Sequence, residues 1–77
     1  MNLKKAQMAL LLLGFENFLD RENTFIREVG HKKISVFYES SPNYFSIRVN
    51  NLVRDDVYKV GSADALKEKL LELINEP

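Results

Sequence analysis

The first hydrophobic residues of the chain are spaced as in a helix. Leu3 to Leu13 contains strong helix formers, such as Lys, Ala, Gln, Met and Leu, and no β-branched residue. Asn2 is suited to cap the start of this helix. Gly14 can adopt the left-handed conformation that ends a helix, with Phe15 packing back on the last turn. The pattern therefore predicts a helix that stops at Gly14.

Hydrophobic and polar residues alternate through the middle of the chain, as in strands with one buried face. The predicted strands are Thr24–Val29, Lys33–Glu39, Tyr44–Asn50 and Val57–Val60. Turn residues separate them at 30–32 and 41–43, and these short connections predict an antiparallel meander.

Residues 15–23 allow two interpretations. In the preferred one, Phe15–Leu19 is a short extended piece and Asp20–Asn23 is a polar turn. In the alternative, the first helix continues to Gly30, because several apolar residues keep an approximate helical spacing. Such a helix would be about 40 Å long, which is too long for a compact domain of this size.

A second helix is predicted from Ala63 to about Asn75. Ser62 is its expected N-cap, and Asp64 places a negative charge in the first turn, where the helix dipole favours it. Its apolar stripe consists of Leu66, Leu70, Leu73 and Ile74. The predicted fold is one small α+β domain over residues 1–77: an N-terminal helix, an antiparallel four-stranded meander and a C-terminal amphipathic helix on one sheet face.

Alternation also assigns the two faces of the predicted sheet. The core face, expected to meet both helices, carries Ile34, Val36, Tyr38, Phe45, Ile47 and Val49. The opposite face carries a mixed surface that includes Phe37, Tyr44 and Arg48. We expect these three residues to be available to a partner.

The first helix has more apolar surface than one sheet contact requires. Met8, Leu11 and Leu12 point roughly opposite to a second stripe formed by Ala6, Ala9, Leu10 and Leu13. Either the terminal helix covers the surplus stripe or a protein partner does, in the simplest case a second copy of the chain. The candidate partner-binding residues of this helix are Ala6, Leu10 and Leu13, and Leu10→Glu is expected to dissociate or unfold the protein.

Composition narrows the function classes. The 77 residues include 11 basic and 11 acidic ones, so no net charge attracts the chain to phosphate or anionic lipid. The apolar run before Phe15 is too short to cross a bilayer, and Gln7 interrupts it, so neither a membrane span nor a secretory signal is expected. Without cysteine or an N-x-S/T acceptor, the chain is predicted to be cytoplasmic.

Residues capable of catalysis are scattered. His31 is expected to be a solvated turn residue, Ser40 and Ser41 to be turn residues, and Asp55 and Asp56 to lie in a loop. No metal-ligand spacing and no glycine-rich phosphate motif is present in the sequence. We therefore expect no enzyme activity, no metal, no cofactor and no small-molecule substrate.

Two local patterns resemble known families. The order helix, strands, helix is similar to the double-stranded RNA-binding domain, which implies binding through the start of the last helix; here that helix opens Ser62-Ala63-Asp64-Ala65, without the family's lysines. The string LLGFENFLDRENTF looks like the opening of HicA-type toxin domains, in which a histidine begins the second strand. Asn23, Thr24 and Phe25 stand there, so ribonuclease activity is not carried over.

The sequence favours a non-enzymatic protein-interaction module, a small accessory or regulatory protein that self-associates through its first helix. Its size alone suits a phage or mobile-element protein. The alternative is a single-stranded nucleic-acid or RNA-binding domain that uses Phe37, Tyr44 and Arg48 on the open sheet face, together with basic residues such as Lys59.

Overall fold

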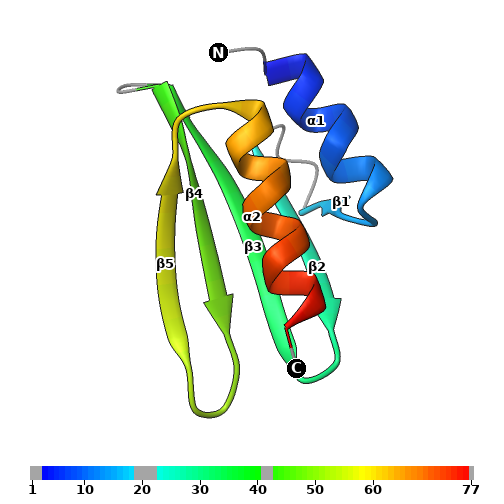
Figure 1. Ribbon diagram of the computed structural model, residues 1–77, viewed down its shortest axis with the longest axis vertical. Coiled ribbons are helices and arrows are strands. Elements are labelled where there is room, and N and C mark those ends of the chain that lie inside the picture. The colour runs from blue at the N-terminus through cyan, green and yellow to red at the C-terminus, as the bar shows by residue number, and fades with distance from the viewer. Residues whose placement is uncertain (1–2, 19–22, 41–42, 77) are drawn as a thin grey trace.

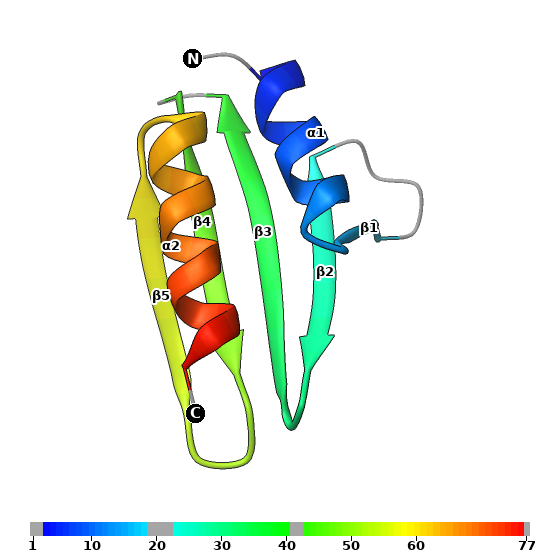
Figure 2. The ribbon, with the colours of Figure 1, turned by 45° about the vertical axis from the view of Figure 1, so that its right-hand side comes forward.

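The computed structural model describes residues 3–18, 23–40 and 43–76. Its elements are, in chain order, α1 (Leu3–Leu12), β1 (Glu16–Asn17), β2 (Thr24–Val29), β3 (Lys32–Ser40), β4 (Asn43–Asn50), β5 (Asp55–Val60) and α2 (Ala63–Asn75). The strands form one antiparallel sheet in the order β1-β2-β3-β4-β5, and both helices lie side by side on one face of it (Figures 1 and 2). The predicted α+β fold is confirmed.

The sheet has five strands rather than the four predicted. The additional strand β1 is only two residues long and pairs with Phe25 and Ile26 of β2. This short strand corresponds to the predicted extended piece after Gly14, and the alternative of one helix running to Gly30 is wrong. A two-residue ladder is too short to show an alternating pattern, so the sequence could not identify it as a strand.

α1 ends as its sequence predicts. Gly14 has a φ of 84°. The Gly14 N–H donates to the carbonyl oxygen of Leu11 at 3.1 Å, and the Phe15 N–H donates to that of Leu10 at 2.9 Å. These two hydrogen bonds form a Schellman motif, which satisfies carbonyls left over at the helix end. Arg27 of β2 supports the same end, because its Nη1 donates to the Leu13 carbonyl oxygen at 2.6 Å.

The core lies between the helical layer and the inward face of the sheet. It contains the predicted strand residues Ile34, Val36, Phe45, Ile47 and Val49, and Tyr38 packs against its margin. From the helices it receives Ala6, Leu10, Ala63, Leu66, Leu70 and Leu73. Phe15 and Phe25 complete it, so the start of the sheet is anchored beneath the end of α1.

α2 also matches its prediction. The Ser62 side chain accepts a hydrogen bond from the Ala65 N–H at 3.1 Å, and the helix ends at Asn75. Asp64 lies in the first turn, 3.0 Å from the Nζ of Lys5 on α1. This ion pair joins the starts of the two helices.

Several residues that were expected in the connections of the meander belong to its strands. Lys32 begins β3, Ser40 ends β3 and Asn43 begins β4, so the predicted turns are shorter than expected. Asp55 and Asp56 are the first residues of β5 and not part of a loop, because Asp55 pairs with Asn50 and Asp56 with Val49 in the ladder. The hairpin between β2 and β3 turns at Gly30, whose φ is 62°, and at the exposed His31. The predictions for Asn2, for residues 19–22 and for Ser41 lie outside the described residues.

A polar network joins β3, β5 and the end of α2. The guanidinium of Arg54 contacts the carboxylates of Asp56 and Glu76 and donates to the Tyr58 hydroxyl at 2.8 Å. Lys32 brings its Nζ to 3.3 Å from the Glu76 carboxylate and 3.4 Å from the Glu76 carbonyl oxygen. The hydrogen bond from Arg54, with a smaller contribution from Lys32, lowers the pKa of Glu76 below its ordinary value of 4.5.

Replacing Gly14 with alanine is expected to destabilise the fold by about 1–2 kcal/mol, since a β-carbon is unfavourable at a positive φ. The new methyl would also meet the Arg27 guanidinium, whose Nε lies 3.4 Å from its position. Urea denaturation measures the change. Gly61→Ala is the control, because no atom beyond its chain neighbours lies within 4 Å of an added β-carbon there and its φ lies outside the left-handed region. Equal stability of the two variants would contradict this account of the helix end.

Acid is expected to weaken the fold through Glu76. Because its pKa is lower in the folded chain, its ion pairs stabilise the fold fully above the ordinary pKa of 4.5. That contribution is lost as the pH falls toward the folded-state pKa. Thermal unfolding should show Glu76→Gln less stable than wild type near neutral pH, with the difference shrinking on acidification. Glu68→Gln, at an exposed position of α2 that forms no ion pair among the described residues, is the control.

Candidate interaction surfaces

The outer side of α1 is apolar and exposed. Met8, Leu11 and Leu12 are 58%, 59% and 86% exposed, and their spacing places them on one side of the helix. We call these three residues the α1 stripe. Such a cluster on a small domain is characteristic of surfaces that bind a partner.

The structure corrects the choice of stripe made from sequence. Ala6 and Leu10 are fully buried in the chain's own core, so they are not available to a partner. Leu13 is partly buried and packs against that core. The sequence indicated correctly that α1 has two apolar sides, but the side facing the sheet is the one that was assigned to a partner.

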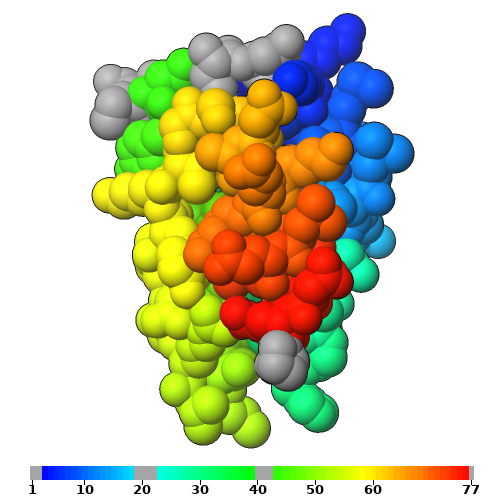
Figure 3. Space-filling view, viewed as in Figure 1, coloured from blue at the N-terminus to red at the C-terminus, as the bar shows by residue number. Residues whose placement is uncertain are grey.

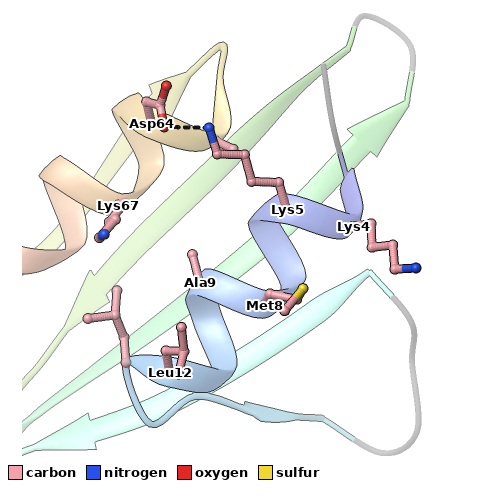
Figure 4. Close-up of a pocket in the computed structure, with 9 residues that line it drawn as sticks. Lys4, Lys5, Met8, Ala9, Leu12, Asp64 and Lys67 are labelled. Atoms are coloured by element: carbon pink, nitrogen blue, oxygen red, sulfur yellow. Dashed lines mark ion pairs between the residues drawn. The ribbon is translucent and has the colours of Figure 1, made fainter.

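α2 covers only part of this surplus. Between α1 and the first turns of α2 lies an open groove of about 510 Å³, lined mainly by apolar side chains. Figure 4 shows Ala9 and Leu12 on the side of α1 that faces α2, with the Lys5–Asp64 ion pair bridging the helices. Met8 and Leu12 belong to both the groove and the α1 stripe. The terminal helix α2 therefore covers part of the apolar surface of α1 and leaves the rest exposed.

Basic residues also line this groove. Lys4, Lys5 and Lys67 contribute to its lining, and the one carboxylate there, Asp64, is paired with Lys5. Within the described part of the chain, Lys4 and Lys67 form no ion pair. The groove thus combines an apolar wall with an excess of positive charge.

The open sheet face brings together the three residues assigned to it. Phe37 on β3 and Tyr44 and Arg48 on β4 occupy neighbouring positions of the ladder, on the side away from the helices. Three cations of this face have partners. Arg48 forms two 2.8 Å hydrogen bonds to Asp55, Lys59 Nζ lies 5.2 Å from the centre of the Tyr44 ring, and Lys33 Nζ lies 5.8 Å from the centre of the Phe18 ring. The same face also carries the acidic residues Glu28 and Glu39.

One exposed apolar pair was missed by the sequence reasoning. Leu52 and Val53 form the tip of the β4–β5 hairpin and are 101% and 93% exposed. The tip is held by hydrogen bonds from the Asn51 N–H to the Arg54 carbonyl oxygen at 2.9 Å and from the Val53 N–H to the Asn51 side chain at 2.8 Å. Their position between Asn51 and Arg54 already indicated a turn, in which apolar side chains have no core to enter.

The residues considered for catalysis are not assembled into a site. His31 is exposed in its turn, and Asp55 and Asp56 point to opposite faces of β5. Among the described residues, no group of three or more His, Cys, Asp or Glu side chains is placed to hold a metal ion. In the same residues, no helix has the length and apolar character needed to span a membrane.

Comparison with known proteins found no match to a family model, to a curated protein or to a solved structure. Function must therefore be argued from the surfaces themselves.

Two substitutions on α1 should separate core from surface. Leu10→Glu places a carboxylate in the core, which costs several kcal/mol of stability. A typical domain is stabilised by only roughly 5–15 kcal/mol, so this variant should unfold. Leu12→Glu should change stability by less than about 0.5 kcal/mol, since its side chain is exposed. Thermal unfolding followed by circular dichroism measures the stability of both variants. A similar loss of stability in the two variants would contradict the orientation of α1.

Proposed function

We propose that this chain is a non-enzymatic protein-interaction module that binds an apolar segment of another protein along α1. The observation that carries the proposal is the α1 stripe of Met8, Leu11 and Leu12, left exposed beside the groove that α1 forms with α2. At about 25 cal/mol per Å² of apolar surface, covering these side chains is worth a few kcal/mol. An accessory or regulatory role in the cytoplasm fits a small, cysteine-free chain of this kind.

The charges around the groove favour an acidic partner. Lys4 and Lys67 supply positive charge at its margin, and Lys5 bridges to Asp64. A helix that presents leucines on one side and glutamates beside them would cover the stripe and meet these lysines at once. Recognition of an amphipathic helix in an apolar groove is a common mode of peptide binding.

A second copy of α1 is a poorer complement to this surface. The α1 sequence LKKAQMALLL contains two lysines and no acidic residue. Two α1 helices packed together would bury their leucines but bring no carboxylate to either pair of lysines. We therefore favour another protein over a second copy as the partner of α1. Self-association through α1, as expected from the sequence, is the competing prediction, and the experiment below distinguishes the two.

The nucleic-acid alternative is less favoured. Arg48 is held by Asp55, so binding of phosphate by Arg48 would require this ion pair to be given up. Net neutrality adds no general attraction to a polyanion. Titration of a labelled single-stranded oligonucleotide should accordingly show no salt-sensitive binding.

A labelled synthetic peptide tests the proposal. The probe is an amphipathic helix with leucines at i, i+3, i+4 and i+7 and glutamates on either side, and its control carries lysines in place of the glutamates. Fluorescence anisotropy should show binding of the acidic peptide and much weaker binding of the basic one. Leu12→Glu should weaken the acidic complex roughly tenfold or more, because it removes an exposed leucine that the peptide would cover and adds a charge that repels the glutamates.

Leu52→Glu is the matched control variant, because it makes the same change at an exposed leucine on the hairpin tip, outside the groove. It should bind the acidic peptide as wild type does. Equal binding of both peptides, or no effect of Leu12→Glu, would contradict the proposal. A wild-type oligomer that Leu12→Glu converts to monomers would instead identify a second copy as the occupant of α1.

A further inference from the structure

The outer edge of β5 is unpaired. β5 is the last strand in the sheet order, and it forms the flank of the molecule opposite β1 and β2, while α2 lies beside it over one face of the sheet (Figures 1 and 3). Its backbone N–H and C=O groups on that side have no neighbouring strand in the described part of the chain. An edge of this kind is a template for another strand unless its side chains prevent pairing.

The side chains of β5 are arranged to accept an antiparallel copy of the same strand. Asp55, Val57 and Lys59 alternate with inward-facing residues, so they lie together on the open face of the sheet. Residues directly opposite one another in a ladder share a face. When two β5 strands pair about Val57, each Asp55 stands opposite Lys59 of the other copy, and the two Val57 side chains meet at the centre.

These residues are accessible for this purpose. Val57 is 57% exposed, and the Asp55 side chain is 52% exposed although it accepts hydrogen bonds from Arg48. Lys59 is exposed as well, with its Nζ over the Tyr44 ring. On the helix side of the same ladder, Asp56 would stand opposite Tyr58 of the other copy, which places no two like charges together.

We infer that two copies of this chain associate edge to edge through β5, in the antiparallel register that sets Val57 against Val57. Main-chain hydrogen bonds continue the sheet from one copy into the other, and the two Asp55–Lys59 contacts fix the register. The two-fold axis is perpendicular to the sheet, so both helical layers lie on the same side of it. The α1 surfaces remain outside this contact, and the inference does not depend on the function proposed for them.

Charge reversal at one position of each pair provides the test. Lys59→Glu alone sets two acidic side chains against each other, and Asp55→Lys alone sets two basic ones. Sedimentation velocity should show a wild-type dimer, and each variant should raise its dissociation constant roughly tenfold or more, because like charges placed opposite one another repel. Circular dichroism should show both variants folded.

An equal mixture of the two variants should form a dimer again, because every acidic side chain then stands opposite a basic one. Loss of folding cannot produce this result, since mixing would not restore it. A wild-type protein that stays monomeric as its concentration is raised, or a mixture no more associated than its components, would overturn the inference. A dimer that both charge variants keep and Leu12→Glu abolishes would also overturn it and assign self-association to α1.

Discussion

The packing of Leu10, Leu66 and Leu70 onto the inward face of β3 and β4 is the contact on which the rest of this structure depends. All three leucines are fully buried, and they meet a sheet face made of Ile34, Ile47 and Val49. Among the described residues of this 77-residue chain, the buried hydrophobic side chains form one cluster between the helices and the sheet. Small domains bury a limited fraction of their surface, so little stabilisation is left over for any other purpose.

That constraint explains where the candidate surfaces lie. Two helices can cover only one face of the sheet, so the other face remains exposed and is made compatible with water by contacts such as Arg48–Asp55. The groove between α1 and the first turns of α2 is bridged by the Lys5–Asp64 ion pair but is not filled by side chains of either helix. The β5 edge is open because the meander ends there and the chain turns into α2 above the sheet.

The two proposed contacts differ in the symmetry of their charges. α1 carries lysines without acidic residues and therefore complements something unlike itself. β5 carries an acidic and a basic residue on either side of an exposed valine and therefore complements its own antiparallel copy. The two surfaces are on different elements, so both can be occupied at once. A dimer formed through β5 would present two α1 surfaces on the same side of the sheet, and a partner with two binding segments would bind it more tightly than a single copy.

Local chemistry was enough to predict most of the fold. The helix stop at Gly14, the cap at Ser62 and the inward residues of β3 and β4 follow from propensity and alternation, which act over a few residues and need no knowledge of the remaining chain. The length of β1 and the start of β5 at Asp55 were not predicted. Both depend on hydrogen bonding to another strand, which is β2 for Glu16 and β4 for Asp55. The local pattern of hydrophobic and polar residues does not contain this information.

Which side of α1 is buried was decided by the tertiary structure alone. The sequence of α1 is apolar on two sides, so its helical pattern determines that a surplus exists but not which side faces the sheet. The choice is fixed where the helix ends: Phe15 enters the core, and Arg27 binds the Leu13 carbonyl. These contacts turn Ala6 and Leu10 inward and leave Met8, Leu11 and Leu12 exposed. The sequence determined that this helix has a surface to offer, and only the fold decided which residues form it.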